Sequence, residues 1–168
     1  MADFLLLFLL AICLFTDLKK RKIYNKVLVP ALLLGIILNV FNYGVFGLIF
    51  SLKGFFTGLL FLILPYTWGG IGAGDVKLLA TIGSIKGPTF VLYAGLYMGI
   101  AGGVLAILIL IYQKRLFVTV KDLLTGFIIL FATRFKVANF GNKNANNMFP
   151  YGVAITMGAL AAYIVGVT

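Results

Sequence analysis

Long apolar stretches run along the whole chain, separated by short polar or glycine-rich connections. This pattern predicts membrane spans over residues 1–16, 27–42, 53–65, 75–86, 89–112 and 150–167. The apolar runs lack the alternation of a barrel strand. Because no water reaches the bilayer core, backbone groups there must bond within the protein, which leaves helical bundles or closed barrels. The sequence therefore predicts an all-α, polytopic transmembrane bundle of about six spans.

The connections carry most of the chain-breaking residues. Residues 42–51 indicate a turn between the second and third spans, and 67–74 holds too many glycines for a stable helix. Gly87 and Pro88 end the fourth span. Charges interrupt the apolar pattern over 116–136, which favours an amphipathic helix at the interface over a further span. A polar loop rich in asparagine follows over 139–147.

Composition supports a membrane protein. Of the 168 residues, 62% are hydrophobic and only 11% are charged, more apolar surface than a soluble domain of this length can bury. We expect one membrane-embedded domain over residues 1–168. The single cysteine, Cys13, lies in an apolar segment and can form neither an intrachain disulfide nor a CxxC metal site. No metal or other cofactor is expected.

The basic residues predict the orientation. The net charge of +10 comes from short connections beside apolar spans, a pattern typical of loops facing anionic lipid rather than of nucleic-acid binding. The run Lys19-Lys20-Arg21-Lys22 follows the first span, the reverse of a secretory signal. The positive-inside rule then places the N-terminus outside and this run in the cytoplasm. On this topology, Lys53 and Lys86 are the only basic residues that would lie outside. We expect a multi-pass protein of the plasma or inner membrane.

The four acidic residues are Asp3, Asp17, Asp75 and Asp122. Asp75 follows three small residues at the edge of a span, where a carboxylate is costly, about 2.5–3.5 kcal/mol at a helix centre. Asp17 closes the first span, so the predicted topology brings both to the cytoplasmic face. Asp3 would lie on the opposite side, and Asp122, next to a lysine in 116–136, is expected to be a solvated or ion-paired surface group.

Two neighbouring carboxylates suit acid–base chemistry. Such chemistry needs one group that takes up a proton and another that donates one. Close carboxylates cannot both ionise cheaply, so they share a proton and divide these roles. Each aspartate could instead cap a helix, and Asp75 is well placed to cap the fourth span. Capping and catalysis are compatible.

The order of these motifs resembles the type IV prepilin peptidase family, membrane aspartic proteases of the GxGD kind. The resemblance is carried by Asp17 with the basic run leading to Asn25, by Gly72-Ala73-Gly74-Asp75-Val76-Lys77, and by Pro150-Tyr151-Gly152 near the C-terminus. One departure is Tyr24, where the family usually has proline. We expect this change to alter only the turn into the second span.

The resemblance implies a reaction and a substrate. Asp17 and Asp75 would be the catalytic pair of an endopeptidase that removes the short basic leader from type IV pilin-like precursors. Larger members also methylate the new N-terminus and carry paired cysteines in an added N-terminal region. This chain is similar to the short, peptidase-only forms of Tad-type pilus systems and archaeal preflagellin peptidases.

Seven further residues are candidates for shaping the site: Gly72, Gly74, Lys77, Asn25, Pro150, Tyr151 and Gly152. The two glycines before Asp75 either admit a close backbone or form a flexible turn. The lysine either tunes the carboxylate pair or snorkels to the interface. The asparagine either orders its loop or caps the second span. The last three either line the site or only begin the last helix.

Two other classes of protein stay open on the residues alone. Another GxGD protease, of the presenilin or signal-peptide-peptidase kind, would place its first aspartate within a span, whereas Asp17 directly precedes a basic run. A transport or membrane-assembly protein would use the two aspartates to bind a cation. Transporters more often show internal repeats and helices broken at mid-membrane, and this sequence shows no repeat.

Overall fold

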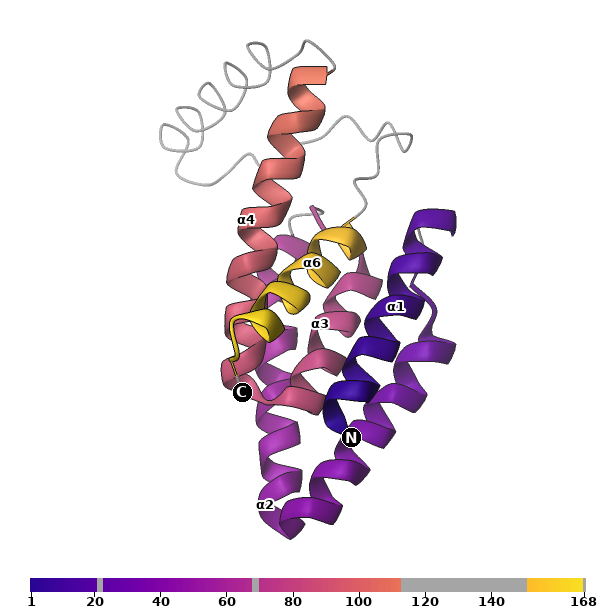
Figure 1. The fold of residues 1–168 in the computed structure, drawn as a ribbon, viewed down its shortest axis with the longest axis vertical. Coiled ribbons are helices and arrows are strands. Elements are labelled where there is room, and N and C mark those ends of the chain that lie inside the picture. The colour runs from indigo at the N-terminus through magenta and orange to yellow at the C-terminus, as the bar shows by residue number, and fades with distance from the viewer. Residues whose placement is uncertain (21–22, 68–69, 113–150, 168) are drawn as a thin grey trace. The chain divides into compact units, whose positions relative to one another are not determined.

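The computed structural model describes residues 1–20, 23–67, 70–112 and 151–167. Over these residues the chain forms helices and no strand, which confirms the all-α prediction (Figure 1). The five helices are α1 (Ala2–Lys20), α2 (Asn25–Thr67), α3 (Ala73–Lys86), α4 (Pro88–Tyr112) and α6 (Tyr151–Ile164). The predicted interfacial helix over 116–136 and the polar loop over 139–147 lie outside the described residues.

The chain divides into two compact units, one formed by residues 1–102 and 149–168 and the other by 103–148. Helix α4 passes from the first unit into the second after Gly102. Both predicted aspartates belong to the first unit, and the description below concerns that unit. The single-domain expectation stays a prediction.

Within the described residues, two helices are long and apolar enough to cross a membrane, α2 and residues 88–108 of α4. Helix α2 has 43 residues, about 65 Å of helix against a hydrocarbon core of about 30 Å. It is interrupted at Gly44, whose φ of 58° and ψ of −135° are not helical. Figure 1 shows α2 folding back on itself there. The predicted turn is therefore sharper than expected, because residues 45–51 are already helical. The count of six spans stays a prediction.

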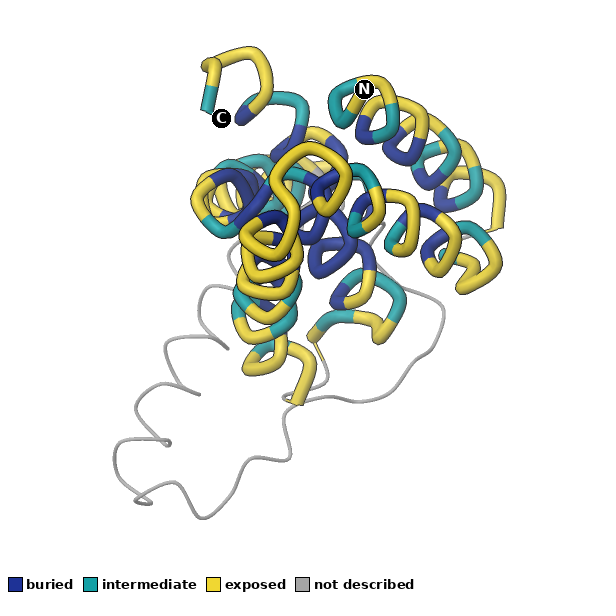
Figure 2. Tube along the Cα trace, turned by 90° about the horizontal axis from the view of Figure 1, so that it is seen from below, coloured by how far each residue is buried: buried dark blue, intermediate teal, exposed yellow. Residues whose placement is uncertain are grey.

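Helix α3 is the most deeply buried helix. Val76 and all of residues 78–85 are buried, leaving exposed side chains only near its first turn. In Figure 2 buried residues gather toward the inside of the packed helices, while exposed residues follow their outer faces. Beyond its first turns, α3 is therefore surrounded by other helices. This burial explains how a helix of only 14 residues is held in place.

Small residues on α2 allow α3 to approach closely. A Cβ atom on Gly54 or Gly83 would collide with the backbone of the other glycine. A Cβ on Gly58 would lie 2.6 Å from the Leu79 carbonyl oxygen, and one on Gly35 2.7 Å from Ile85 Cγ1. Helices in membranes associate through such small residues, because lipid is as apolar as the side chains and packing must drive the contact.

A buried amide joins the two arms of α2 to the end of α3. Asn39 Nδ2 donates to Ser51 Oγ at 2.9 Å and to the Ser84 and Ile85 carbonyl oxygens at 3.0 and 3.2 Å. A Cβ on Gly47 would collide with the Asn39 carbonyl, so the second arm passes close by. The amide fixes the hairpin against α3 because a buried polar group must find its partners within the protein.

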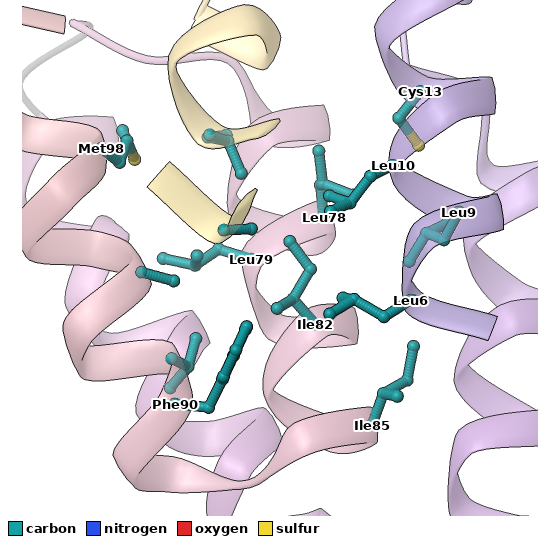
Figure 3. Close-up of a cluster of buried hydrophobic side chains, with 14 of the residues drawn as sticks. Leu6, Leu9, Leu10, Cys13, Leu78, Leu79, Ile82, Ile85, Phe90 and Met98 are labelled. Atoms are coloured by element: carbon teal, nitrogen blue, oxygen red, sulfur yellow. The ribbon is translucent and has the colours of Figure 1, made fainter. Parts of the chain in front are cut away.

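Helices α1, α4 and α6 cover the remaining faces of α3. Leu6, Leu9, Leu10 and Cys13 of α1 are buried, and Figure 3 shows them beside Leu78, Ile82 and Ile85 of α3. Cys13 is thus a packing residue of this cluster. A Cβ on Gly158 of α6 would meet the Ala94 carbonyl oxygen of α4 at 2.5 Å, so these two helices also pack closely.

An ion pair fixes the end of α1 that lies far from Asp17. Lys86, the last residue of α3, contacts Asp3 Oδ1 through Nζ at 2.7 Å. The same ammonium lies 5.6 Å from the ring centre of Phe90 and 5.8 Å from that of Tyr163. Four helices therefore meet at one cation whose side chain is only 11% exposed. Asp3 lies at the opposite end of α1 from Asp17.

The glycine contact gives a stability prediction. We expect Gly83→Val to lower the free energy of unfolding by about 1–3 kcal/mol or more, because the added carbons have no room against Gly54. Thermal unfolding in detergent measures the effect. Gly99→Val is the matched control, since no atom lies within 4 Å of a Cβ at Gly99. Equal melting temperatures for the two variants would contradict the predicted role of the contact.

Candidate active site

Asp17 lies in the last turn of α1. The helix extends beyond the predicted span end at residue 16 and continues to Lys20. Lys19 and Lys20 follow Asp17 at the helix C-terminus, where the helix dipole favours cations. Asp17 is only 5% exposed, one of the few buried polar side chains of the described residues. A carboxylate is therefore held inside the protein at one end of α1.

Asp75 lies in the first turn of α3. Gly72 precedes the helix with extended backbone (φ −77°, ψ 149°), and its N–H donates to Asp75 Oδ2 at 3.3 Å. The carboxylate thus satisfies one of the free N–H groups at the helix start, where the dipole also favours negative charge. The capping role considered for Asp75 is present in the structure. The other carboxylate oxygen is not used in this bond.

The structure brings the two aspartates together. They are 58 residues apart in the sequence, and both line one cavity of about 360 Å³ together with Ile23, Tyr24, Asn25, Gly72 and Gly74. Asp17 is also near enough to Asp75 to act on it electrostatically. Both carboxylates can therefore face the same small molecule or peptide bond.

Three glycines leave room for this arrangement. A Cβ on Gly72 would lie 3.1 Å from Asp75 Oδ2, and one on Gly74 would lie 3.2 Å from Ile23 Cβ. A Cβ on Gly152, near the start of α6, would lie 2.5 Å from Asp17 Oδ2. The glycine motif thus admits both the Asp75 carboxylate and the segment that follows α1. Helix α6 packs against Asp17 through a residue with no side chain.

Two other predicted site residues, Lys77 and Tyr151, lie close to residues that line this cavity. Lys77 Nζ donates to Asn25 Oδ1 at 3.3 Å, which links α3 to the first residue of α2. Tyr151 is partly buried and close enough to Asp75 to interact with it electrostatically. Pro150 lies outside the described residues. Over the described residues, no three His, Cys, Asp or Glu side chains gather as metal ligands would.

Comparison with known proteins decides the family. A family model described as the type IV leader peptidase family matches residues 4–107, more than half of the chain. The chain belongs to the type IV leader peptidase family. The match contains both aspartates and ends before α6. Searches of curated proteins and of solved structures give no significant match.

Membership in the leader peptidase family identifies the protein as a protease, and its apolar helices identify it as a membrane protein. The match contains Asp17, the glycine motif and Asp75, and thus the residues that line the cavity on α1 and α3. The two residues of α6 that lie near the carboxylates, Tyr151 and Gly152, are outside the match. Their place in the site rests on the structure alone.

Two residues of this leader peptidase were not predicted to belong to the site. Ile23 and Tyr24 line the cavity beside the two carboxylates. We expected Tyr24 to affect only the turn before α2, and its position shows that it also borders the space between the aspartates. Both residues lie in the sequence between Asp17 and Asn25, so their position already suggested that they belong to the site. Only the structure shows that this segment packs against α3.

The contact between α6 and Asp17 gives an activity prediction. We expect Gly152→Ala to lower kcat/KM for peptide cleavage by about 10²-fold, because a Cβ there displaces the Asp17 carboxylate and misplaced catalytic groups lose about this much. Cleavage of a leader-bearing peptide in detergent or vesicles measures it. Gly102→Ala is the control, because its Cβ would meet Ala154 at an ordinary 3.7 Å. Equal losses in both variants would contradict the prediction.

Proposed function

We propose that this protein is a membrane aspartic endopeptidase in which Asp17 and Asp75 form the catalytic pair. The observation that carries the proposal is the single cavity lined by both carboxylates in a chain of the leader peptidase family. The two aspartates come from different helices, and each is positioned by contacts with a glycine. This arrangement fits a proton-sharing pair better than two independent helix caps.

The pair supplies both proton transfers of peptide hydrolysis. The ionised carboxylate takes a proton from a water molecule, whose oxygen attacks the carbonyl carbon of the scissile bond. The protonated partner donates its proton as the tetrahedral intermediate breaks, and the carbon–nitrogen bond is cleaved with the proton on the departing amine. The products are a carboxylate and a new N-terminus. The shared proton belongs to the pair rather than to either residue.

The substrate we propose is the precursor of a type IV pilin or pilin-like subunit, cut between its short basic leader and its apolar helix. The apolar helix of such a precursor can pack among helices in the bilayer, while the leader junction reaches carboxylates near the membrane surface. The basic run 19–22 would repel a basic leader, so we assign it to anionic lipid head groups and to orientation.

The proposed topology has the N-terminus outside and the active site at the cytoplasmic face of the plasma or inner membrane. Asp3 and Lys86 would then both be on the outer side, and the ion pair between them agrees with their lying on the same side. Along α1, 14 residues separate Asp3 from Asp17, about 21 Å of helix and most of the hydrocarbon thickness.

The catalytic assignment predicts the effect of removing either carboxylate. We expect Asp17→Asn and Asp75→Asn each to lower the cleavage rate by about 10²–10⁴-fold, because asparagine keeps size and hydrogen bonding but cannot exchange the proton. Gel mobility of a co-expressed pilin-like precursor measures it. Asp3→Asn is the control, since it removes a carboxylate from the other end of α1. Normal processing by either asparagine variant would show that the pair is not catalytic.

A shared proton also predicts the pH dependence. We expect kcat/KM to pass through a maximum and to fall on both sides. Below the optimum both carboxyls are protonated and no base remains, and above it both are ionised and no acid remains. Initial cleavage rates over a range of buffers measure the profile, with the unfolding temperature followed at each pH as a control. A rate that rises to a plateau on the alkaline side would contradict the two-carboxylate mechanism.

A further inference from the structure

The segment 23–25 forms one wall of the cavity that holds both aspartates. Its backbone is anchored to α2, because the Tyr24 carbonyl oxygen accepts from the N–H groups of Val27 at 3.0 Å and Leu28 at 3.3 Å. Its flanking residues are anchored to α3. Ile23 packs on Gly74, and Asn25 accepts the hydrogen bond from Lys77 at 3.3 Å. The wall is therefore held in place on both sides of Tyr24.

The side chain of Tyr24 is the part of this wall that stays available. It is 37% exposed, and Lys20 Nζ lies 5.7 Å from its ring centre. A cation at this distance from the ring restrains its orientation. A positioned aromatic ring on a fixed backbone can contact a ligand at little cost in conformational entropy.

The remaining residues around the cavity have other tasks. The two carboxylates carry the proposed chemistry, and the two glycines have no side chain to contact a substrate. Ile23 and Asn25 are already engaged with α3. Among the residues that line the cavity, Ile23 and Tyr24 have sizeable apolar side chains, and Tyr24 is the larger and the more exposed of the two.

We infer that Tyr24 is a specificity-determining residue, which contacts the substrate side chain next to the scissile bond and favours a large apolar one. The inference rests on the proposed peptidase function of Asp17 and Asp75. In a hydrophobic contact, a difference of one methylene group between two substrates changes their kcat/KM ratio by about 10–200-fold at most. We therefore expect a graded preference rather than an absolute one.

The experiment compares matched substrates. Peptides with the same leader and apolar helix carry Leu, Ala or Ser, in one series directly before the scissile bond and in another directly after it. We expect Tyr24→Ala to reduce the ratio of kcat/KM for Leu over Ala by about tenfold in one of the two series. Tyr24→Phe keeps the ring and is expected to keep the ratio. Tyr43→Ala removes an exposed tyrosine next to the Gly44 bend of α2 and is the matched control.

The outcomes separate this inference from the proposed function. If Tyr24→Ala lowers kcat/KM equally for every peptide, or leaves kcat/KM unchanged for all of them, Tyr24 does not select the substrate. The proposed function still stands in that case if the two aspartate variants lose activity. If the aspartate variants cleave normally, the proposed function itself is wrong. Unfolding temperatures of all Tyr24 variants, which we expect to match the native protein, distinguish a change in selectivity from a change in folding.

Discussion

The close approach of α2 and α3 is the constraint on which the rest of the structure depends. Gly54 and Gly83 bring the two backbones into contact, and a side chain at either position would separate the helices. In a bilayer apolar side chains gain little by leaving lipid, so this packing must supply the stabilisation that the hydrophobic effect supplies in water. Helix α3 is then enclosed by its neighbours, and the carboxylate at its first turn is held at a fixed place.

Helices α1 and α3 are antiparallel, and aspartates lie at both ends of this pair. The charges around them differ between the two ends. At one end Asp3 is neutralised by Lys86 with two aromatic rings beside the ammonium. At the other end Asp17 and Asp75 border one cavity. The ion pair stabilises the fold, while two carboxylates sharing a site raise the electrostatic energy of the folded state. Such costly arrangements cluster at functional sites, which is consistent with the proposed role of the pair.

The all-helical fold, the turn in α2, the break after Thr67 and the beginning of α4 at Pro88 could be predicted, because glycine, proline and apolar runs act locally. The same reasoning found Asp17, Asp75 and the glycine motif. It could not show that Gly152 packs on Asp17 or that Tyr24 borders the cavity. These contacts join residues from different helices, and their existence depends on how the helices pack. The end of α1 was also placed too early, since Asp17 itself is helical.

The sequence by itself determined that this chain belongs in a membrane, that its helices are apolar on most sides, and that Asp17 and Asp75 lie at the ends of helices. These properties follow from the transfer cost of each residue and from local backbone preferences, which are present in any stretch of chain. Only the tertiary structure decided which side chains share a cavity. That decision depends on the rotation and spacing of the packed helices, which glycine contacts help to set both between α2 and α3 and beside the aspartates.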